Sequence, residues 1–124
     1  MNIRVVLVED DRKARNELKW LLETQGCTVV YGETGGDALE LTADCEPDGL
    51  VVSWSACGSD PLRFIRIIHM SLPGLPVFLT VDPSDRVDRK EAAGAGVSRI
   101  FTKPLDKDEV QFFFARILGA ACGL

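Results

Sequence analysis

Five short runs of apolar, largely β-branched residues alternate with stretches of helical periodicity along this chain of 124 residues. Short apolar runs bounded by turn-forming residues are typical of strands that are buried on both faces. We expect strands at residues 3–8, 28–31, 49–54, 76–81 and 99–102. Strands that alternate with helices pair in parallel through right-handed crossovers. The pattern therefore predicts an α/β fold with a central parallel sheet and helices on both faces.

The segments between these runs carry signals of helix ends. A first helix is expected after Asp10 or Asp11 and before Gly26, because a carboxylate caps a helix amino end and glycine often follows a carboxyl end. The run Thr34-Gly35-Gly36-Asp37 is typical of a capping box and predicts a second helix. Further helices are expected at residues 62–70, 84–93 and from 106 or 107 to 121. A chain of this length suits one hydrophobic core, so we predict a single domain over residues 1–124.

Composition excludes several classes of function. The net charge of −5 argues against a nucleic-acid partner, because phosphate backbones attract clustered lysine and arginine. No apolar run approaches the roughly 20 residues that a membrane-spanning helix needs, so we expect no membrane contact. The four cysteines are scattered, with no C-x-x-C pair, which is typical of reduced thiols and not of a zinc site. We expect a cytoplasmic protein.

Charged and polar residues stand where the predicted strands end. Glu9 and Asp10 follow the first strand, Ser53 lies at the end of the third, and Lys103 follows the fifth. The carboxyl ends of parallel strands meet at one edge of a sheet, where α/β proteins bind their ligands. Carboxylates that face a lysine there suggest a site for a hard cation such as Mg²⁺. Alternatively, Asp10 and Asp11 only cap the helix, which would explain one of them but not the Glu-Asp ending of an apolar strand.

Four motifs follow one another in a fixed order: Leu7-Val8-Glu9-Asp10, Gly35-Gly36-Asp37-Ala38-Leu39, Pro47-Asp48-Gly49-Leu50-Val51-Val52 and Thr102-Lys103-Pro104. Together they resemble the receiver domain of bacterial response regulators, and the resemblance covers nearly the whole chain. It implies a flavodoxin-like, doubly wound sheet of five parallel strands in the order 2-1-3-4-5, with five helices. In that family an aspartate after the third strand accepts a phosphoryl group from a histidine kinase. An acidic pair holds Mg²⁺ there, and a lysine after the fifth strand pairs with the phosphate.

The resemblance assigns Glu9 and Asp10 to the acidic pair and Lys103 to the lysine, but the acceptor position falls on Ser53. An aspartate is already anionic at neutral pH, whereas a serine hydroxyl is neutral and needs a general base to attack phosphorus. We therefore expect no catalytic residue and no enzyme activity. With a neutral side chain at Ser53, Mg²⁺ binding at Glu9 and Asp10 should be weak or absent.

Two further positions of the family pattern also differ. The switch hydroxyl after the fourth strand falls on Val81, although a slip of one residue would restore Thr80. The switch aromatic residue falls on Ile100. Because input and transmission residues have changed together, the pattern favours a pseudo-receiver that acts mainly by phosphorylation-independent protein–protein interaction.

Candidate partner contacts are Phe112, Arg89 and Arg99. On a helical wheel Phe112 points nearly opposite to the core stripe, and an exposed phenylalanine would serve as a contact point or would simply be a lone surface apolar residue. In the receiver family the corresponding face of the fourth helix, fifth strand and fifth helix often forms dimers or docks partners. We expect the partner to be another signalling protein or a second copy of the chain.

Two other functions compete with this interpretation. The first is a phosphorelay response regulator that still accepts a phosphoryl group or Mg²⁺ at a non-standard site. The second is a small flavodoxin-like enzyme or nucleotide binder. The second is disfavoured, because the loop after the first strand is Glu-Asp-Asp, which repels phosphate, and no glycine-rich cradle follows it.

Overall fold

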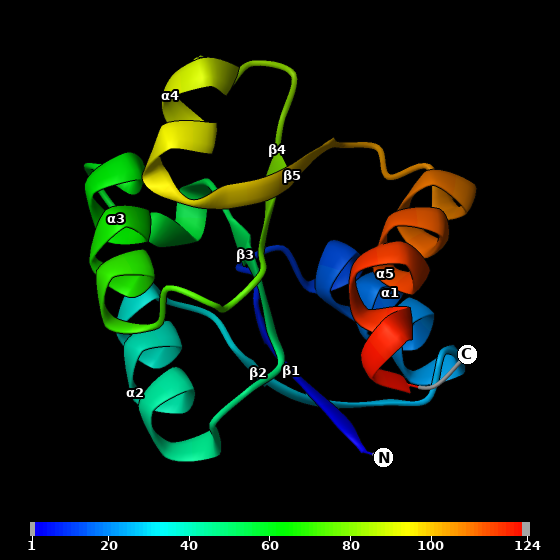
Figure 1. Cartoon of the computed structure of the whole chain (residues 1–124). Coiled ribbons are helices and arrows are strands. Elements are labelled where there is room, and N and C mark those ends of the chain that lie inside the picture. Colours follow the sequence, from blue (N-terminus) through cyan, green and yellow to red (C-terminus); the bar gives the residue numbers. More distant parts are fainter. Residues whose placement is uncertain (1, 123–124) are drawn as a thin grey trace.

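One parallel sheet organises the part of the chain that the structure describes, with its strands in the order β2-β1-β3-β4-β5 (Figure 1). The computed structural model describes residues 2–122, with side chains as far as Leu118. The strands are β1 (Ile3–Val8), β2 (Cys27–Gly32), β3 (Gly49–Ser53), β4 (Val77–Val81) and β5 (Val97–Thr102). The helices are α1 (Arg12–Thr24), α2 (Gly35–Cys45), α3 (Pro61–Ser71), α4 (Arg89–Ala95) and α5 (Lys107–Cys122), with a short 3-10 helix, η1 (Ser55–Cys57). The predicted flavodoxin-like α/β fold and its strand order are confirmed.

Two apolar clusters lie on opposite faces of the sheet. Figure 1 shows α1 and α5 on one side and α2, α3 and α4 on the other. Leu18 and Phe114 are wholly buried on the α1 and α5 side, whereas Ile65 and Ala92 are wholly buried on the opposite side. The three central strands are buried along nearly their whole length, which explains why their sequences are continuously apolar and do not alternate with polar residues.

Helix capping separates the roles of two neighbouring aspartates. Asp11 is the cap of α1, and its Oδ1 accepts a hydrogen bond from the N–H of Lys13 at 3.1 Å. Asp10 is therefore released from capping and points toward the end of β3. The predicted capping box is confirmed at α2, where Thr34 and Asp37 exchange side-chain and backbone hydrogen bonds.

The fourth helix begins later than the sequence pattern predicts. A helix was expected at residues 84–93, but α4 begins at Arg89, because the Asp88 carboxylate caps it by accepting from the N–H groups of Lys90 and Glu91. The preceding residues form a turn in which the Asp82 N–H donates to Asp85 Oδ2 at 2.8 Å. Smaller differences occur at strand ends: Trp54 lies outside β3, and β5 begins two residues before the predicted position 99.

No helix within residues 2–122 combines the length and the apolar character that crossing a membrane would require.

Candidate functional site

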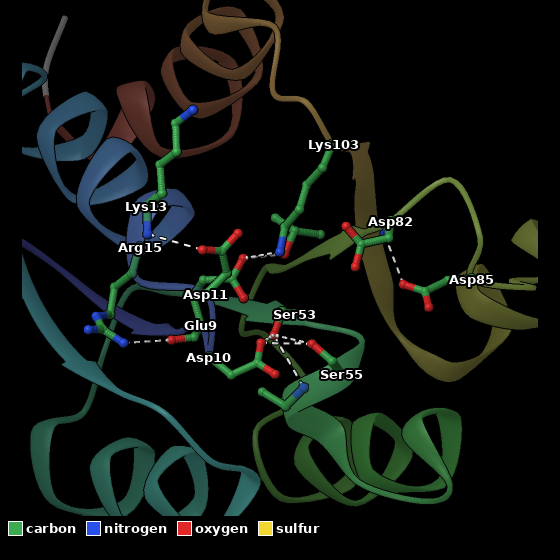
Figure 2. Close-up of polar contacts among 12 residues, drawn as sticks. Glu9, Asp10, Asp11, Lys13, Arg15, Ser53, Ser55, Asp82, Asp85 and Lys103 are labelled. Carbon is green, nitrogen blue, oxygen red and sulfur yellow. Dashed lines mark hydrogen bonds and ion pairs between the residues drawn. The ribbon is translucent and has the colours of Figure 1, made fainter.

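The carboxyl ends of β1, β3 and β5 bring together four of the residues that the sequence singled out (Figure 2). Glu9 and Asp10 follow β1, Ser53 is the last residue of β3, and Lys103 follows β5. Parallel strands all point in one direction, so the residues that follow them gather at the same edge. We call this group of four side chains the crevice.

Glu9 and Lys103 form a buried ion pair in the crevice. Lys103 Nζ lies 2.5 Å from Glu9 Oε1, the Glu9 side chain is fully buried, and that of Lys103 is 12% exposed. Burial raises the pKa of Glu9, although contacts with Lys103 and Ser53 oppose the shift. The second oxygen, Oε2, is buried without a hydrogen-bond partner among the described residues. The lysine thus compensates the carboxylate on one oxygen only.

Ser53 is held by hydrogen bonds on both sides of its hydroxyl. Its Oγ donates to Asp10 Oδ1 at 3.0 Å and accepts from the Ala56 N–H at 3.2 Å. The side chain is almost completely buried. Ser55 also donates to Asp10 Oδ1, at 2.7 Å, so one carboxylate oxygen collects two hydroxyl groups. This arrangement stabilises Asp10 as an anion and fixes the Ser53 hydroxyl in place.

The crevice supplies no strong base next to the serine. Burial alone would raise the pKa of Asp10, but hydrogen bonds from the Ser55 and Ser53 hydroxyls hold it below its usual value. A carboxylate with a lowered pKa is a weak proton acceptor. The single histidine, His69, belongs to the last turn of α3 and packs against Gly96. Glu9 has a raised pKa, but its Oε1 is paired with Lys103 and the Ser53 hydroxyl donates to Asp10, the weaker base of the two carboxylates. The hydrogen bonds therefore do not direct the Ser53 proton to the base that would make the hydroxyl a nucleophile.

The donor atoms of the crevice fit a divalent cation poorly. A hard cation such as Mg²⁺ prefers several oxygen ligands with negative charge. Glu9 is already paired with Lys103, and Ser53 is neutral. Asp10 is therefore the one carboxylate of the crevice that is not paired with the lysine. Within residues 2–122, no three histidine, cysteine, aspartate or glutamate side chains come together in a way that would hold a metal ion.

Thr80 and Val81 lie on opposite faces of the sheet. Thr80 pairs with Ser53 across β3 and β4, and its hydroxyl lies 3.5 Å from Glu9 Oε1, at the edge of hydrogen-bond range. Val81 packs with Ile100 in the apolar cluster beneath α3 and α4. The hydroxyl that faces the crevice on β4 is therefore that of Thr80, while the roles assigned to Val81 and Ile100 by the family pattern stay predictions.

Sequence reasoning missed three residues around the crevice. Ser55 reaches Asp10 from η1, and Arg15 Nη1 donates to the backbone oxygen of Glu9 at 3.1 Å. Asp82, directly after β4, lines a groove of about 880 Å³ together with Lys103. The position of Asp82 directly after a predicted strand was a signal in the sequence that could have identified it as a residue near the crevice. Nothing in the local pattern would have selected Arg15, because it approaches from one turn inside α1.

The three predicted contact residues lie along one surface, which we call the α4–β5–α5 face. Phe112 is 57% exposed and packs edge-on against Phe113, with ring centroids 5.1 Å apart. The Arg99 guanidinium lies 3.8 Å from the Phe113 ring centroid and 3.7 Å from Glu109. Arg89 and Arg99 line the same shallow hollow of about 150 Å³. The residues are thus contiguous, although separate elements carry them.

Comparison with known proteins gives one family. The family model of the response regulator receiver domain matches residues 5–112. "Response regulator MprA" of Mycobacterium ulcerans is 29% identical over 110 residues, which cover 89% of this chain and 47% of that protein. MprA of Mycobacterium bovis is 27% identical over the same length. The chain spans about half the length of the curated relatives that it matches.

Solved structures show the same fold at low identity. The signal receiver domain of an HD domain-containing protein from Pseudomonas fluorescens has a TM-score of 0.86 at 21% identity, and the match covers 100% of both chains. The receiver domain of the Francisella response regulator 1452 has a TM-score of 0.83 at 22% identity, covering 97% of this chain and 99% of that one.

Proposed function

The chain belongs to the response regulator receiver domain family, and from that premise we propose that it is a pseudo-receiver. In this proposal it serves two-component signalling mainly by phosphorylation-independent protein–protein interaction. One observation carries the proposal: the residue at the carboxyl end of β3, beside Asp10, is the neutral Ser53. A phosphoryl group needs an anionic or activated oxygen to attack phosphorus, and this side chain supplies neither.

The ion pair between Glu9 and Lys103 supports the same proposal. In the crevice the lysine ammonium is already satisfied by a buried carboxylate. A phosphoryl group arriving at Ser53 would have to compete with Glu9 for Lys103, and would meet the charges of Glu9 and Asp10 with little metal to offset them. The arrangement favours a crevice in which the lysine is already engaged without phosphate and Asp10 is stabilised by hydroxyl groups without Mg²⁺.

We propose the α4–β5–α5 face as the partner surface. Phe113 contacts both the exposed Phe112 and Arg99, and Arg89 shares a hollow with Arg99. Glu109 and Asp108 are the carboxylates in the first turn of α5. A surface with both charge signs around an aromatic residue suits another signalling protein or a second copy of the chain. The proposal includes neither enzyme activity nor a nucleic-acid or membrane partner, and places the protein in the cytoplasm.

The decisive experiment treats the protein with acetyl phosphate, and separately with beryllofluoride, in the presence of Mg²⁺. We expect no added mass and no change in the amide NMR spectrum, because the crevice lacks an anionic acceptor. The matched variant is Ser53→Asp, which restores a carboxylate at the end of β3. That variant should gain Mg²⁺-dependent phosphorylation while the parent chain does not.

A stoichiometric mass increase in the parent chain would overturn the proposal. It would support the competing function, a phosphorelay regulator that accepts phosphate at a non-standard site. Fragmentation of the modified protein would then identify the acceptor, with Ser53 and Ser55 as the hydroxyl candidates beside Asp10.

A further inference from the structure

A groove of about 680 Å³ lies between α2 and α3, at the end of the sheet opposite to the crevice. It is bordered by the last turns of both helices and by the segments that lead into β3 and β4. Figure 1 shows α2 and α3 side by side on one face of the sheet. The groove shares no residue with the crevice, so an inference about it goes beyond the proposed function and does not depend on the chemistry of Ser53.

The walls of the groove are mainly apolar. Leu39 of α2 and Leu72 at the end of α3 line it while remaining 44% and 36% exposed, and Ile68 and Leu75 form a buried part of the lining. Leucine side chains exposed to this extent on two facing elements form a concave apolar surface. Such a surface binds the apolar face of another segment because both sides lose contact with water.

The charges at the groove are negative. Glu46 and Asp48 are the charged residues of its lining, which includes neither lysine nor arginine. Both α2 and α3 end here, and the carboxyl end of a helix carries partial negative charge on carbonyl groups that lack helical partners. The last turn of α2 contains no basic residue, and the cation that meets this helix end is Arg4 of β1, which bonds the Cys45 carbonyl from outside the groove. The groove therefore attracts cations as well as apolar side chains.

Glu46 occupies a position where glycine is the usual residue. It caps α2 in the left-handed region, with φ 49° and ψ 61°, and is the one non-glycine residue with positive φ in residues 2–122. A side chain in this region is disfavoured relative to glycine. Arg4 approaches from the β1 side, donating its Nη1 to Cys45 O at 2.6 Å and its N–H to Asp48 at 2.9 Å, but it does not line the groove.

From these observations we propose that the α2–α3 groove binds a basic, amphipathic helical segment of a partner protein. The apolar stripe of the segment packs between Leu39 and Leu72, and its lysine or arginine side chains meet Glu46, Asp48 and the helix carbonyls. A second copy of the chain is a poorer occupant. The basic surface of one copy would enter the groove of the next copy, so the contact would be head-to-tail. Such a contact gives a closed assembly only if its rotation generates a ring.

The test uses two synthetic peptides of about 14 residues, long enough for about four helical turns. One combines leucine in a helical stripe with lysine elsewhere, and the other has glutamate in place of every lysine. Titration of the ¹⁵N-labelled protein should shift the amides of the groove, with at least about tenfold tighter binding of the lysine peptide. Equal affinity for both peptides, or shifts centred on the crevice or the α4–β5–α5 face, would overturn the proposal.

Matched variants separate the groove from the rest of α3. Leu72→Ser should lower the affinity for the lysine peptide by about tenfold, because it removes a large part of one apolar wall. Met70→Ser, on the same helix but outside the lining and 81% exposed, should leave affinity unchanged. Equal losses in the two variants would contradict the assignment.

Glu46→Gly distinguishes binding from folding. Glycine relieves the left-handed backbone and so should raise the denaturant midpoint, while loss of the carboxylate should weaken the lysine peptide by about threefold, the size of a surface ion pair. Unchanged affinity in a more stable Glu46→Gly protein would show that the Glu46 carboxylate does not attract the basic peptide, which contradicts the proposal. Concentration-dependent self-association through the groove in the absence of peptide would instead identify a second copy as the occupant and overturn the proposal.

Discussion

Glu9 differs from the other acidic residues of the chain in having a side chain that is fully removed from solvent. One of its oxygens meets Lys103, and the other has no hydrogen-bond partner in the described structure. A buried charge is tolerated when it is paired, and removing one partner leaves the other uncompensated. The stability of the folded protein should therefore fall when either residue of the pair is replaced alone.

Lys103→Met should destabilise the protein by about 3 kcal/mol, because it leaves the Glu9 carboxylate buried without a counter-charge. Adding Glu9→Gln to this variant removes the unpaired charge and should recover most of the loss. Urea unfolding of the parent, the single variant and the double variant measures both effects. A double variant no more stable than Lys103→Met would show that packing of the lysine stem, and not charge, dominates.

The pH dependence of stability should reveal the raised pKa of Glu9. Because the folded state binds the Glu9 proton more tightly than the unfolded state, this residue contributes stability fully below its ordinary pKa of 4.5. The contribution is lost as pH rises through the folded-state pKa. Asp10 acts in the opposite direction: its lowered pKa contributes stability above 3.8, which is lost as pH falls through the folded-state value.

Glu9→Gln isolates the first effect. The free energy of unfolding of the parent, relative to that of the variant, should decline as pH rises from about 4.5, because only the parent loses the bound proton. Chemical unfolding at a series of pH values gives the two curves. Curves that stay parallel across that range would mean that the Glu9 pKa is the same in both states.

At the scale of elements, the contact between α3 and α4 depends on a glycine. Gly96 caps α4 with φ 116°, and a Cβ there would lie 2.6 Å from His69 Cγ. The backbone conformation and the close ring thus both select glycine at this position. Gly94, two residues earlier within α4, has no atom within 4 Å of where its Cβ would lie.

The two glycines should respond oppositely to alanine. Gly96→Ala should destabilise the protein by about 2 kcal/mol, because it adds a strained backbone to a steric clash with His69. Gly94→Ala should instead stabilise it by about 0.5–1 kcal/mol through helix propensity. Thermal or urea unfolding of both variants measures the difference. Similar effects in the two variants would indicate that α4 does not pack against α3 through Gly96.

The geometry of a strand also decides which residue of β4 faces the crevice. Successive side chains of a strand point to opposite sides, so Thr80 and Val81 cannot both face the crevice. Pairing of Ser53 with Thr80 places the threonine on the crevice side. A hydroxyl on β4 is thus available to Glu9, while the next residue belongs to the apolar cluster.

At the scale of the whole molecule, the net charge of −5 opposes self-association, whereas the α4–β5–α5 face presents both charge signs around Phe112. If that face binds a second copy, the dimer should be weak and should dissociate further at high salt, because opposite charges on the two copies would hold it.

Phe112→Ser should abolish this self-association without lowering the denaturant midpoint, because the ring is more than half exposed. Tyr31→Ser is the matched control, since Tyr31 is 55% exposed but belongs to β2, at the opposite edge of the sheet from β5. Sedimentation at several concentrations measures both. A parent chain that stays monomeric, or equal effects of the two variants, would leave another signalling protein as the partner of this face.

The sequence by itself determined the class of fold and the chemical type of each side chain at the sheet edge. Apolar runs must be buried, parallel strands must end at a common edge, and a serine at position 53 carries no charge in any conformation. These conclusions follow from residue type and order alone, so they needed no coordinates.

Only the tertiary structure decided which of these groups meet. It paired Lys103 with Glu9, assigned the helix cap to Asp11 and left Asp10 for Ser53, turned Thr80 toward the crevice, and began α4 at Arg89. Each of these depends on distances of a few ångströms between residues that are remote in the chain or compete for the same hydrogen bond. Local propensity cannot rank such alternatives, because packing of the two helical layers against the sheet selects among them.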